Sequence, residues 1–157
     1  MNIHSYLIDQ TDHDWSAILA DWYWILPRDF TLWLVNRFGD LFIVLGDDTV
    51  HMLDVGAAKL EQVADNREHF TKKIDESGNA NNWLMIPLVD MCVAAGLTLS
   101  AGQIYSYKTP PILGGDYAVD NAEVCDLEVH YSVLGQIQNK IKDLPDGTTV
   151  DRIVKLE

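Results

Sequence analysis

The sequence predicts an α+β fold in which helices pack around a small antiparallel sheet. Three observations support it: a short apolar run (LFIVL, residues 41–45) followed by turn residues, a helical apolar spacing through residues 126–142, and strand-like alternation in QIYSYK (residues 103–108). The chain is 48% apolar, enough to build a core, and its 157 residues fit one domain spanning 1–157.

Two helices are predicted near the N-terminus. The first spans residues 13–22, where four apolar side chains share one helical face: Trp15, Ile18, Leu19 and Trp22. The second spans residues 28–38, because apolar side chains recur there at steps of four: Phe30, Leu34 and Phe38. Pro27 suits the first turn of that helix, and Gly39 suits the position just after it.

A β-hairpin follows. Residues 41–45 form a buried strand, the sequence Gly46-Asp47-Asp48 supplies the turn, and residues 49–55 form the second strand, whose two faces are not clearly distinguished. Residues 57–64 are expected to form a short helix or a turn that flanks a strand.

Helices dominate the middle of the chain. Asn66 is the predicted N-cap of a helix that runs through EHFTKKIDES (residues 68–77) and ends at Gly78. A later helix spans residues 83–95, capped by Asn81 or Asn82, and Pro87 either kinks it or begins its regular part at the preceding residue.

Two patterns compete over residues 126–142. Alternation of apolar residues favours a strand, but apolar steps of four and three extend further and favour a helix with Asp126 as its N-cap. We predict the helix, with strand character before Tyr131. Residues 117–119 are expected to extend another sheet edge, and residues 150–156 a final strand after a turn at Asp146-Gly147.

A shaped loop is predicted over residues 108–117. It contains two prolines, which fix φ, and two glycines, which permit positive φ: Pro110, Pro111, Gly114 and Gly115. An aromatic ladder accompanies it, formed by Tyr105, Tyr107, Tyr117 and Tyr131. Such a loop presents a defined surface, and its tyrosines are candidate interface anchors or half-buried sheet residues.

The chain is strongly acidic, with 24 acidic and 11 basic residues and a net charge of −13. This charge repels nucleic acid and anionic lipid and attracts a basic protein. Residues 1–66, with eleven acids and three bases, carry −8 of it. The two cysteines show no disulfide pattern, and neither a signal peptide nor a membrane segment is evident, so we expect a cytoplasmic protein.

Catalytic motifs are missing, and no cofactor is predicted. The sequence lacks GxxxxGK[ST], HExxH and GxSxG, and its five histidines are widely spread. Glu128 and His130 would share a face only on a strand. Four acids have the oxygen ligands that Mg²⁺ or Ca²⁺ takes, but their spacing matches no calcium loop, and we interpret them as a solvated rim and expect no metal: Asp116, Asp120, Glu123 and Asp126.

An acidic surface with aromatic anchors needs no catalytic residue to inactivate a basic enzyme. We therefore predict a partner-binding surface made of acids near the hairpin and residues of the loop. Its candidate residues are Asp40, Asp47, Asp48, Asp54, Tyr107, Pro110, Pro111, Gly114, Gly115, Asp116 and Tyr117.

Several segments also resemble a known family. The chain is similar to the C-terminal domain of type VI secretion immunity proteins. The similar segments include GQIYSYKTPPILGGDY, VDNAEVCDLEVHY, LGQI and IKDLPDG, and the similarity extends over about residues 12–154. That domain was formerly of unknown function and often follows a GAD-like domain. The resemblance implies a non-enzymatic protein that neutralises a cognate antibacterial toxin, often a nuclease.

Two interpretations of function remain. In the first, the protein is an immunity protein, a monomer or homodimer, that binds a basic toxin and neither nucleic acid nor membrane. The alternative is a regulatory or scaffold module whose protein partner is unrelated to toxins. An enzyme or small-ligand binder that uses Tyr107, Lys108, Asp116 and His130 is a third interpretation, and a deep pocket joining those side chains would favour it.

Overall fold

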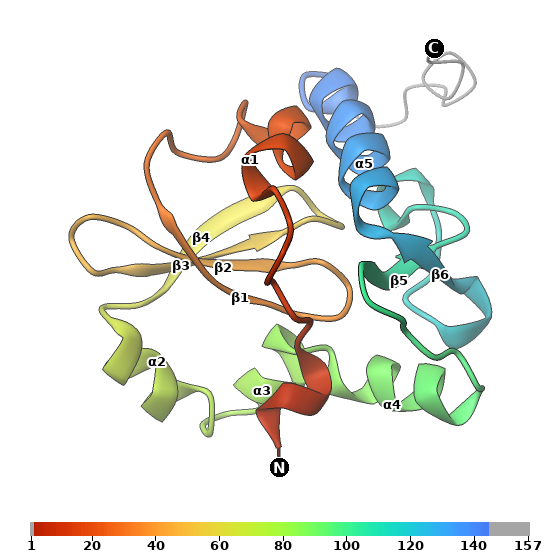
Figure 1. The fold of residues 1–157 in the computed structure, drawn as a ribbon, viewed down its shortest axis with the longest axis horizontal. Coiled ribbons are helices and arrows are strands. Elements are labelled where there is room, and N and C mark those ends of the chain that lie inside the picture. The colour runs from red at the N-terminus through yellow and green to blue at the C-terminus, as the bar shows by residue number, and fades with distance from the viewer. Residues whose placement is uncertain (1, 145–157) are drawn as a thin grey trace.

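The computed structural model describes residues 2–144 and confirms the α+β class. A four-stranded antiparallel sheet in the order β1-β2-β3-β4 forms the centre (Figure 1). Its strands are β1 (Thr31–Val35), β2 (Leu41–Val44), β3 (Val50–Asp54) and β4 (Lys59–Ala64). The predicted hairpin is confirmed, because β2 pairs with β3 from Leu41↔Leu53 to Val44↔Val50.

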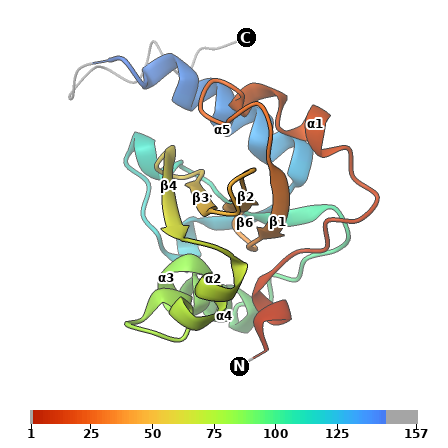
Figure 2. The ribbon, with the colours of Figure 1, turned by 90° about the vertical axis from the view of Figure 1, so that its left-hand side faces the viewer.

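Helices cover both faces of this sheet (Figures 1 and 2). On one face lie α1 (Trp15–Ile18), the 3₁₀ turn η2 (Ala20–Trp22) and α5 (Leu127–Ile141). On the other lie α2 (Arg67–Lys73), α3 (Asn79–Trp83) and α4 (Ile86–Ala94). The chain begins with a 3₁₀ turn, η1 (Ile3–Tyr6), whose following residue Leu7 forms a bridge with Asn36 beside β1.

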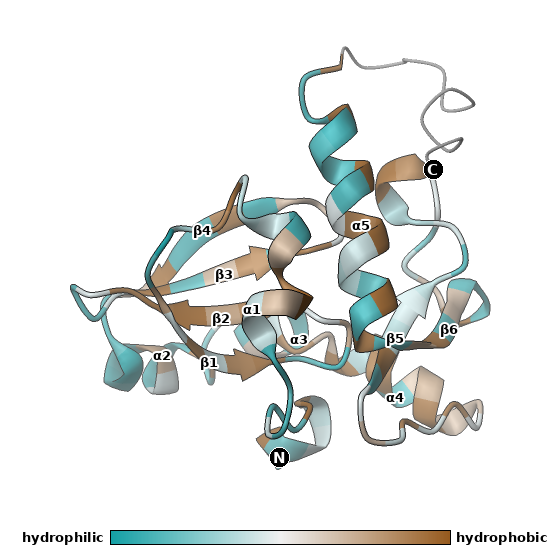
Figure 3. Cartoon of the chain, turned by 45° about the horizontal axis from the view of Figure 1, so that its top comes forward, coloured by the Kyte–Doolittle hydropathy of each residue, from teal (hydrophilic) through white to brown (hydrophobic). Residues whose placement is uncertain are grey.

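The two-sided cover explains the uninterrupted apolar sequence of β2. Leu41 and Ile43 belong to the core under α1 and α5, whereas Phe42 and Val44 belong to the core over α2 and α3. Because successive side chains of a strand point to opposite faces, a strand covered on both sides is apolar at every position. In Figure 3, β2 accordingly shows hydrophobic colour along its length, while much of α5 is hydrophilic.

A second, two-stranded sheet lies beside α5 (Figure 1). Strand β5 (Gln103–Tyr107) pairs with β6 (Ala122–Asp126), and α5 starts directly after β6. Two short 3₁₀ turns, η3 (Pro111–Leu113) and η4 (Val119–Asn121), lie in the connection between the strands. The inner side of β5 packs on α4 through Tyr105, Tyr107 and Cys92 in a third core cluster.

Several local predictions are confirmed. The Asn66 side chain caps α2 by accepting from the His69 N–H at 2.7 Å. Helix α4 begins at the residue before Pro87, which occupies its first turn, where a missing N–H costs no hydrogen bond. The long helix over residues 126–142 is α5, and Asp126 stands at its N-cap position without a capping hydrogen bond from its side chain.

The predicted helix over residues 28–38 is wrong, since this segment contains β1. A β-bulge between Leu32 and Leu34 shifts the register with β2, so apolar residues four apart serve a strand. The turn after β1 is closed by Asn36, whose Oδ1 accepts from the N–H groups of Phe38 and Asp40 at 3.0 and 2.9 Å. Gly39, with φ 89°, belongs to this turn and ends no helix.

Four other predictions are wrong. Residues 59–64 are strand β4, stabilised by pairing with β3 although they lack a clear alternation. Residues 117–119 add no sheet edge, because the partner of β5 is β6, five residues further along. Asn81 and Asn82 lie inside α3, and α5 is helical from Leu127 onward without strand character. The turn at Asp146-Gly147 and the strand over residues 150–156 lie outside the described residues.

None of the helices within residues 2–144 has the length and apolar content that a bilayer-spanning segment needs.

Candidate functional site

Two of the predicted acids meet at one end of the four-stranded sheet. Asp40 immediately precedes β2 and Asp54 ends β3, and the pairing of Leu41 with Leu53 brings these strand ends together. Asp54 is half-buried, and its Oδ1 accepts from the N–H groups of Gly56 and Ala57 at 3.0 and 3.1 Å. The Asp54 side chain therefore closes the turn that leads into β4.

Asp40 was expected on the surface, but its side chain is buried, with 4% exposure. Its Oδ2 accepts from Asn36 Nδ2 at 2.9 Å, and its Oδ1 accepts from the Val55 N–H at 3.0 Å. Burial, and then the neighbouring Asp54 carboxylate, raise the pKa of Asp40 to about 7. Asp40 is thus a buried member of a polar network, and the sequence pattern missed its partner Asn36.

Two predicted tyrosines face these acids. Tyr107 comes from β5 and Tyr117 from the loop after it, with ring centroids 5.5 Å apart and nearly perpendicular planes. A cavity of about 150 Å³ lies between them and the sheet end, and we call it the acidic–aromatic pocket. Its main lining side chains are Phe38, Asp40, Asp54, Asn82, Tyr107 and Tyr117.

The predicted loop of residues 108–117 has a defined conformation held by Asn121. The Asn121 amide accepts from the Thr109 N–H at 3.0 Å and donates to the carbonyls of Thr109 and Asp116 at 2.9 and 2.8 Å. Gly115 packs so closely that a Cβ there would lie 1.8 Å from the Thr109 carbonyl oxygen, so no other residue fits. Asn121 is a further residue that the sequence pattern did not single out.

The outer surface of this loop forms a second hollow, of about 320 Å³. It is lined by Thr109, Gly114, Gly115, Asp116, Asp120 and Asn121. Pro110 and Pro111 lie beside it at the start of the 3₁₀ turn η3. Three of the predicted contact residues, Gly114, Gly115 and Asp116, therefore line one hollow.

Asp47 and Asp48 lie at the opposite end of the sheet, in the exposed turn between β2 and β3 (Figure 1). The Asp47 carboxylate accepts from the Thr49 hydroxyl and from the Thr49 N–H, the latter at 3.1 Å, and these two bonds lower the pKa of Asp47. Asp48 takes the left-handed conformation, with φ 71°, that completes the turn. The predicted contacts thus divide into two groups, this turn and the acidic–aromatic pocket with its loop.

His130 does not form the pair with Glu128 that a strand would have allowed, since both lie on α5 and Glu128 is exposed. The His130 Nδ1 lies 2.8 Å from Ser106 Oγ, and Nε2 has no hydrogen-bond partner within residues 2–144. Burial lowers the pKa of His130 to about 4, so the imidazole is neutral. Of the other residues proposed for a small-ligand site, Tyr107 lines the acidic–aromatic pocket and Asp116 lines the outer hollow of the loop, and neither cavity is lined by His130 or Lys108.

The described part of the chain contains no candidate metal site. Within residues 2–144, no three His, Cys, Asp or Glu side chains gather closely enough to hold a metal ion. Cys92 is fully buried, and burial raises the pKa of its thiol; burial, Glu123 and Asp126 do the same for Cys125. Neither thiol has the lowered pKa of a reactive cysteine.

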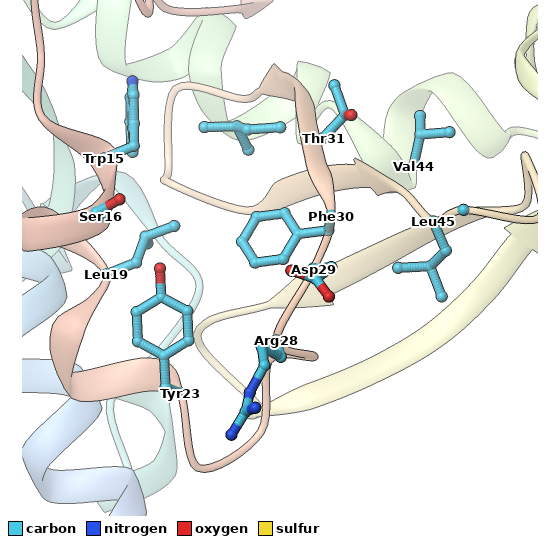
Figure 4. Close-up of a pocket in the computed structure, with 12 residues that line it drawn as sticks. Trp15, Ser16, Leu19, Tyr23, Arg28, Asp29, Phe30, Thr31, Val44 and Leu45 are labelled. Carbon is cyan, nitrogen blue, oxygen red and sulfur yellow. The ribbon is translucent and has the colours of Figure 1, made fainter.

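A wider hollow of about 520 Å³ lies between α1 and the start of β1 (Figure 4). The Phe30 ring extends toward Leu19 and Tyr23, whereas the Arg28 guanidinium points away from that ring. Its lining mixes apolar and polar side chains and contains one acid, Asp29, and one base, Arg28. This hollow offers a surface for contact but assembles no nucleophile with a base.

Asp40 and His130 make opposite contributions to the pH dependence of stability. Asp40 has its pKa raised from 3.8 to about 7, so its contribution to the free energy of unfolding falls as pH rises from about 4 to about 7. His130 has its pKa lowered from 6.5 to about 4, so its contribution rises between pH 4 and 6.5. The two effects oppose each other, each on the order of several kcal/mol at about 1.4 kcal/mol per pKa unit.

Each variant keeps only the titration of the other group. We therefore expect the free energy of unfolding of Asp40→Asn to rise as pH increases from 4 to 6.5, and that of His130→Gln to fall over the same interval. Urea unfolding of both variants at pH 4.5, 6.5 and 8 measures these changes in stability. The first two pH values lie near the ends of the titration range, and pH 8 lies beyond it. Identical pH profiles for the two variants would contradict the assignment of these titrations.

Comparison with known proteins agrees with the resemblance seen in the sequence. Residues 64–138 match the family described as "T6SS immunity protein Tdi1, C-terminal". No curated protein matches the chain. A crystal structure of Atu4351 from Agrobacterium tumefaciens is similar at 18% identity with a TM-score of 0.49, covering 77% of this chain and 60% of that chain. The chain therefore spans less than two thirds of the length of that similar protein.

The matched segment runs from the end of β4 through most of α5 and includes Tyr107, Asn121 and the whole 108–117 loop. The segment 64–138 is therefore similar to the C-terminal domain of the type VI secretion immunity protein Tdi1.

Proposed function

We propose that the protein binds a cognate antibacterial toxin in the cytoplasm of the producing cell and neutralises it without catalysis. The family match over residues 64–138 carries this proposal, because the matched domain is that of an immunity protein. Within residues 2–144, no group of three His, Cys, Asp or Glu side chains is placed to hold a metal ion. A binding role needs no such group.

We further propose that the toxin is basic, as a nuclease domain is. Within residues 2–144 only two side-chain ion pairs form, His69–Asp65 and Lys72–Glu68, both at α2. The acids at the two ends of the sheet therefore have no cationic partner in the described chain. Proteins that act on nucleic acid carry positive surfaces, and an acidic inhibitor competes with the phosphates for them.

The turn with Asp47 and Asp48 tests the proposed steering. Replacing both by lysine should lower the association rate with the toxin about tenfold or more at low salt and weaken its salt dependence, because both acids are exposed and unpaired. The association rate is measured by stopped-flow mixing at two ionic strengths, with the toxin-like product of a neighbouring reading frame as the partner.

The matched control is Asp75→Lys with Glu76→Lys, which changes the net charge equally at exposed positions after α2. Equal slowing by both pairs would indicate a general charge effect and would remove the turn from the contact surface. A partner that associates at the same rate with all three proteins would contradict electrostatic steering altogether.

A further inference from the structure

The acidic–aromatic pocket is lined by two polar groups whose hydrogen-bonding capacity is not fully used within residues 2–144. Tyr107 is 7% exposed, and the one hydrogen bond of its hydroxyl within the described residues goes to the Met85 sulfur at 4.0 Å, a weak acceptor. Asp54 uses only Oδ1 in its turn, and its Oδ2 has no hydrogen-bond partner within residues 2–144. A buried hydroxyl with only a weak acceptor is costly unless a ligand satisfies it, and the half-buried Asp54 Oδ2 is free to accept from such a ligand.

The volume of the pocket limits what it holds. At about 150 Å³ it is well below the roughly 300–1,000 Å³ typical of pockets for drug-sized ligands or cofactors. It has room for the end of one side chain or for a cation of a few atoms. Tyr117, with 54% of its surface exposed, forms the outer wall, and its hydroxyl lies next to Gly56, where a Cβ would be 3.1 Å away.

The lining favours a cation. The Asp54 carboxylate lies on the sheet side, beside the buried Asp40 whose two oxygens are already hydrogen-bonded, and no Lys, Arg or His of the described residues lines the cavity. The rings of Tyr107 and Tyr117 provide faces that attract an ammonium or guanidinium group. An anion would be repelled here, and a neutral apolar group would leave the Asp54 Oδ2 unsatisfied.

We propose that this pocket binds the ammonium or guanidinium end of a single lysine or arginine side chain presented by a protein partner. This inference rests on the proposed function for the identity of the partner, a basic toxin. The site itself rests on the pocket: a donor-rich cation on a short alkyl chain matches its depth, its acceptors and its aromatic walls. Tyr107 and Asn82 lie within the segment that matches the immunity family.

The first experiment tests the pocket without any toxin. Titration of the ¹⁵N-labelled protein with n-butylammonium should produce saturable shifts at the amides of Gly56 and Ala57, which bond to Asp54. The neutral n-butanol should not. Asp54→Asn keeps the turn, since Asn accepts the same bonds, and should weaken n-butylammonium binding about tenfold or more. Asp75→Asn, which removes one exposed charge after α2, should leave it unchanged.

The second experiment identifies the source of the cation. Asp54→Asn should raise the Kd of the toxin complex about tenfold or more, and Tyr117→Phe, which keeps the ring, should raise it less. Equal binding of n-butanol, or no effect of Asp54→Asn on n-butylammonium, overturns the pocket as a cation site. If n-butylammonium binds but Asp54→Asn does not change the Kd of the toxin complex, the claim that a side chain of the protein partner supplies the cation is overturned.

If the proposed function is wrong, these experiments give a different result from the one expected if the pocket is not a cation site. A wild-type protein that binds n-butylammonium in an Asp54-dependent manner but forms no complex with the toxin would refute the toxin as partner and leave a cation site for another protein. The probe titration and the toxin Kd therefore separate the two proposals.

Discussion

Asn36→Ala should lower the free energy of unfolding by about 3–5 kcal/mol, which is a large fraction of the stability of a typical domain. Asn36 is fully buried, and its amide joins four groups that have few alternatives. Its oxygen accepts from the Phe38 and Asp40 N–H groups, and its nitrogen donates to the Asp40 carboxylate and to the Trp83 carbonyl, each bond 2.9–3.0 Å long.

The loss goes beyond one hydrogen bond because the variant leaves a buried carboxylate without one of its two donors. Uncompensated buried charges cost more than neutral groups, and the pKa of Asp40 should rise further. Urea unfolding at pH 8, where Asp40 is charged, measures the effect at its greatest. Asn139→Ala, at an exposed position of α5, is the matched control and should cost well under about 1 kcal/mol. Equal costs for the two variants would show that the buried network contributes nothing special.

Trp22→Ala should cost about 3–5 kcal/mol for a different reason, the cavity that it leaves in the core. Trp22 is fully buried between the sheet and α5, and its Nε1 donates to the Tyr131 carbonyl at 2.9 Å. Helix α5 approaches so closely here that a Cβ at Gly135 would lie 2.7 Å from the Asp21 carbonyl oxygen and 2.9 Å from Trp22 Nε1. The helix therefore cannot move in to fill the space.

Trp24→Ala is the control for this prediction. Trp24 stacks on Trp22 with centroids 5.9 Å apart, but it is only half-buried, so its truncation opens less of a cavity. Denaturant unfolding followed by circular dichroism compares the variants without relying on tryptophan fluorescence. If Trp24→Ala proved as costly as Trp22→Ala, the close packing of α5 on η2 would not be the source of the stability.

Much of the fold was predictable where the signals are local. The hairpin turn around Asp47, the cap at Asn66 and the helix start set by Pro87 each follow from the backbone preferences of a few residues. Helix α5 was predictable because its apolar spacing persists over four turns. These signals depend on no distant contact.

Tertiary pairing decided the elements that the sequence pattern missed. Strand β1 contains a bulge, so its apolar residues recur at a spacing that also fits a helix. Strand β4 is stabilised by its pairing with β3. Strand β6 pairs with β5 and follows a loop without alternating apolar residues. Tertiary contacts also decided the parts of the site that the sequence pattern missed. Tyr107 and Tyr117 were identified from composition, but the burial of Asp40 and the bonds of Asn36 and Asn121 arise from contacts that composition does not encode.

The central claim is that this protein acts by binding a basic toxin through acidic surfaces, and one measurement tests it most directly. The toxin-like product of a neighbouring reading frame is expressed in a bacterial host with the wild-type protein, with Asp47→Lys/Asp48→Lys or with Asp75→Lys/Glu76→Lys, and growth and the Kd of the purified complex are recorded. We expect the wild type and the α2-side control to restore growth and to form a tight complex, and the turn variant to bind more weakly and protect less. Growth arrest in the presence of the wild-type protein, without a detectable complex, would contradict the account.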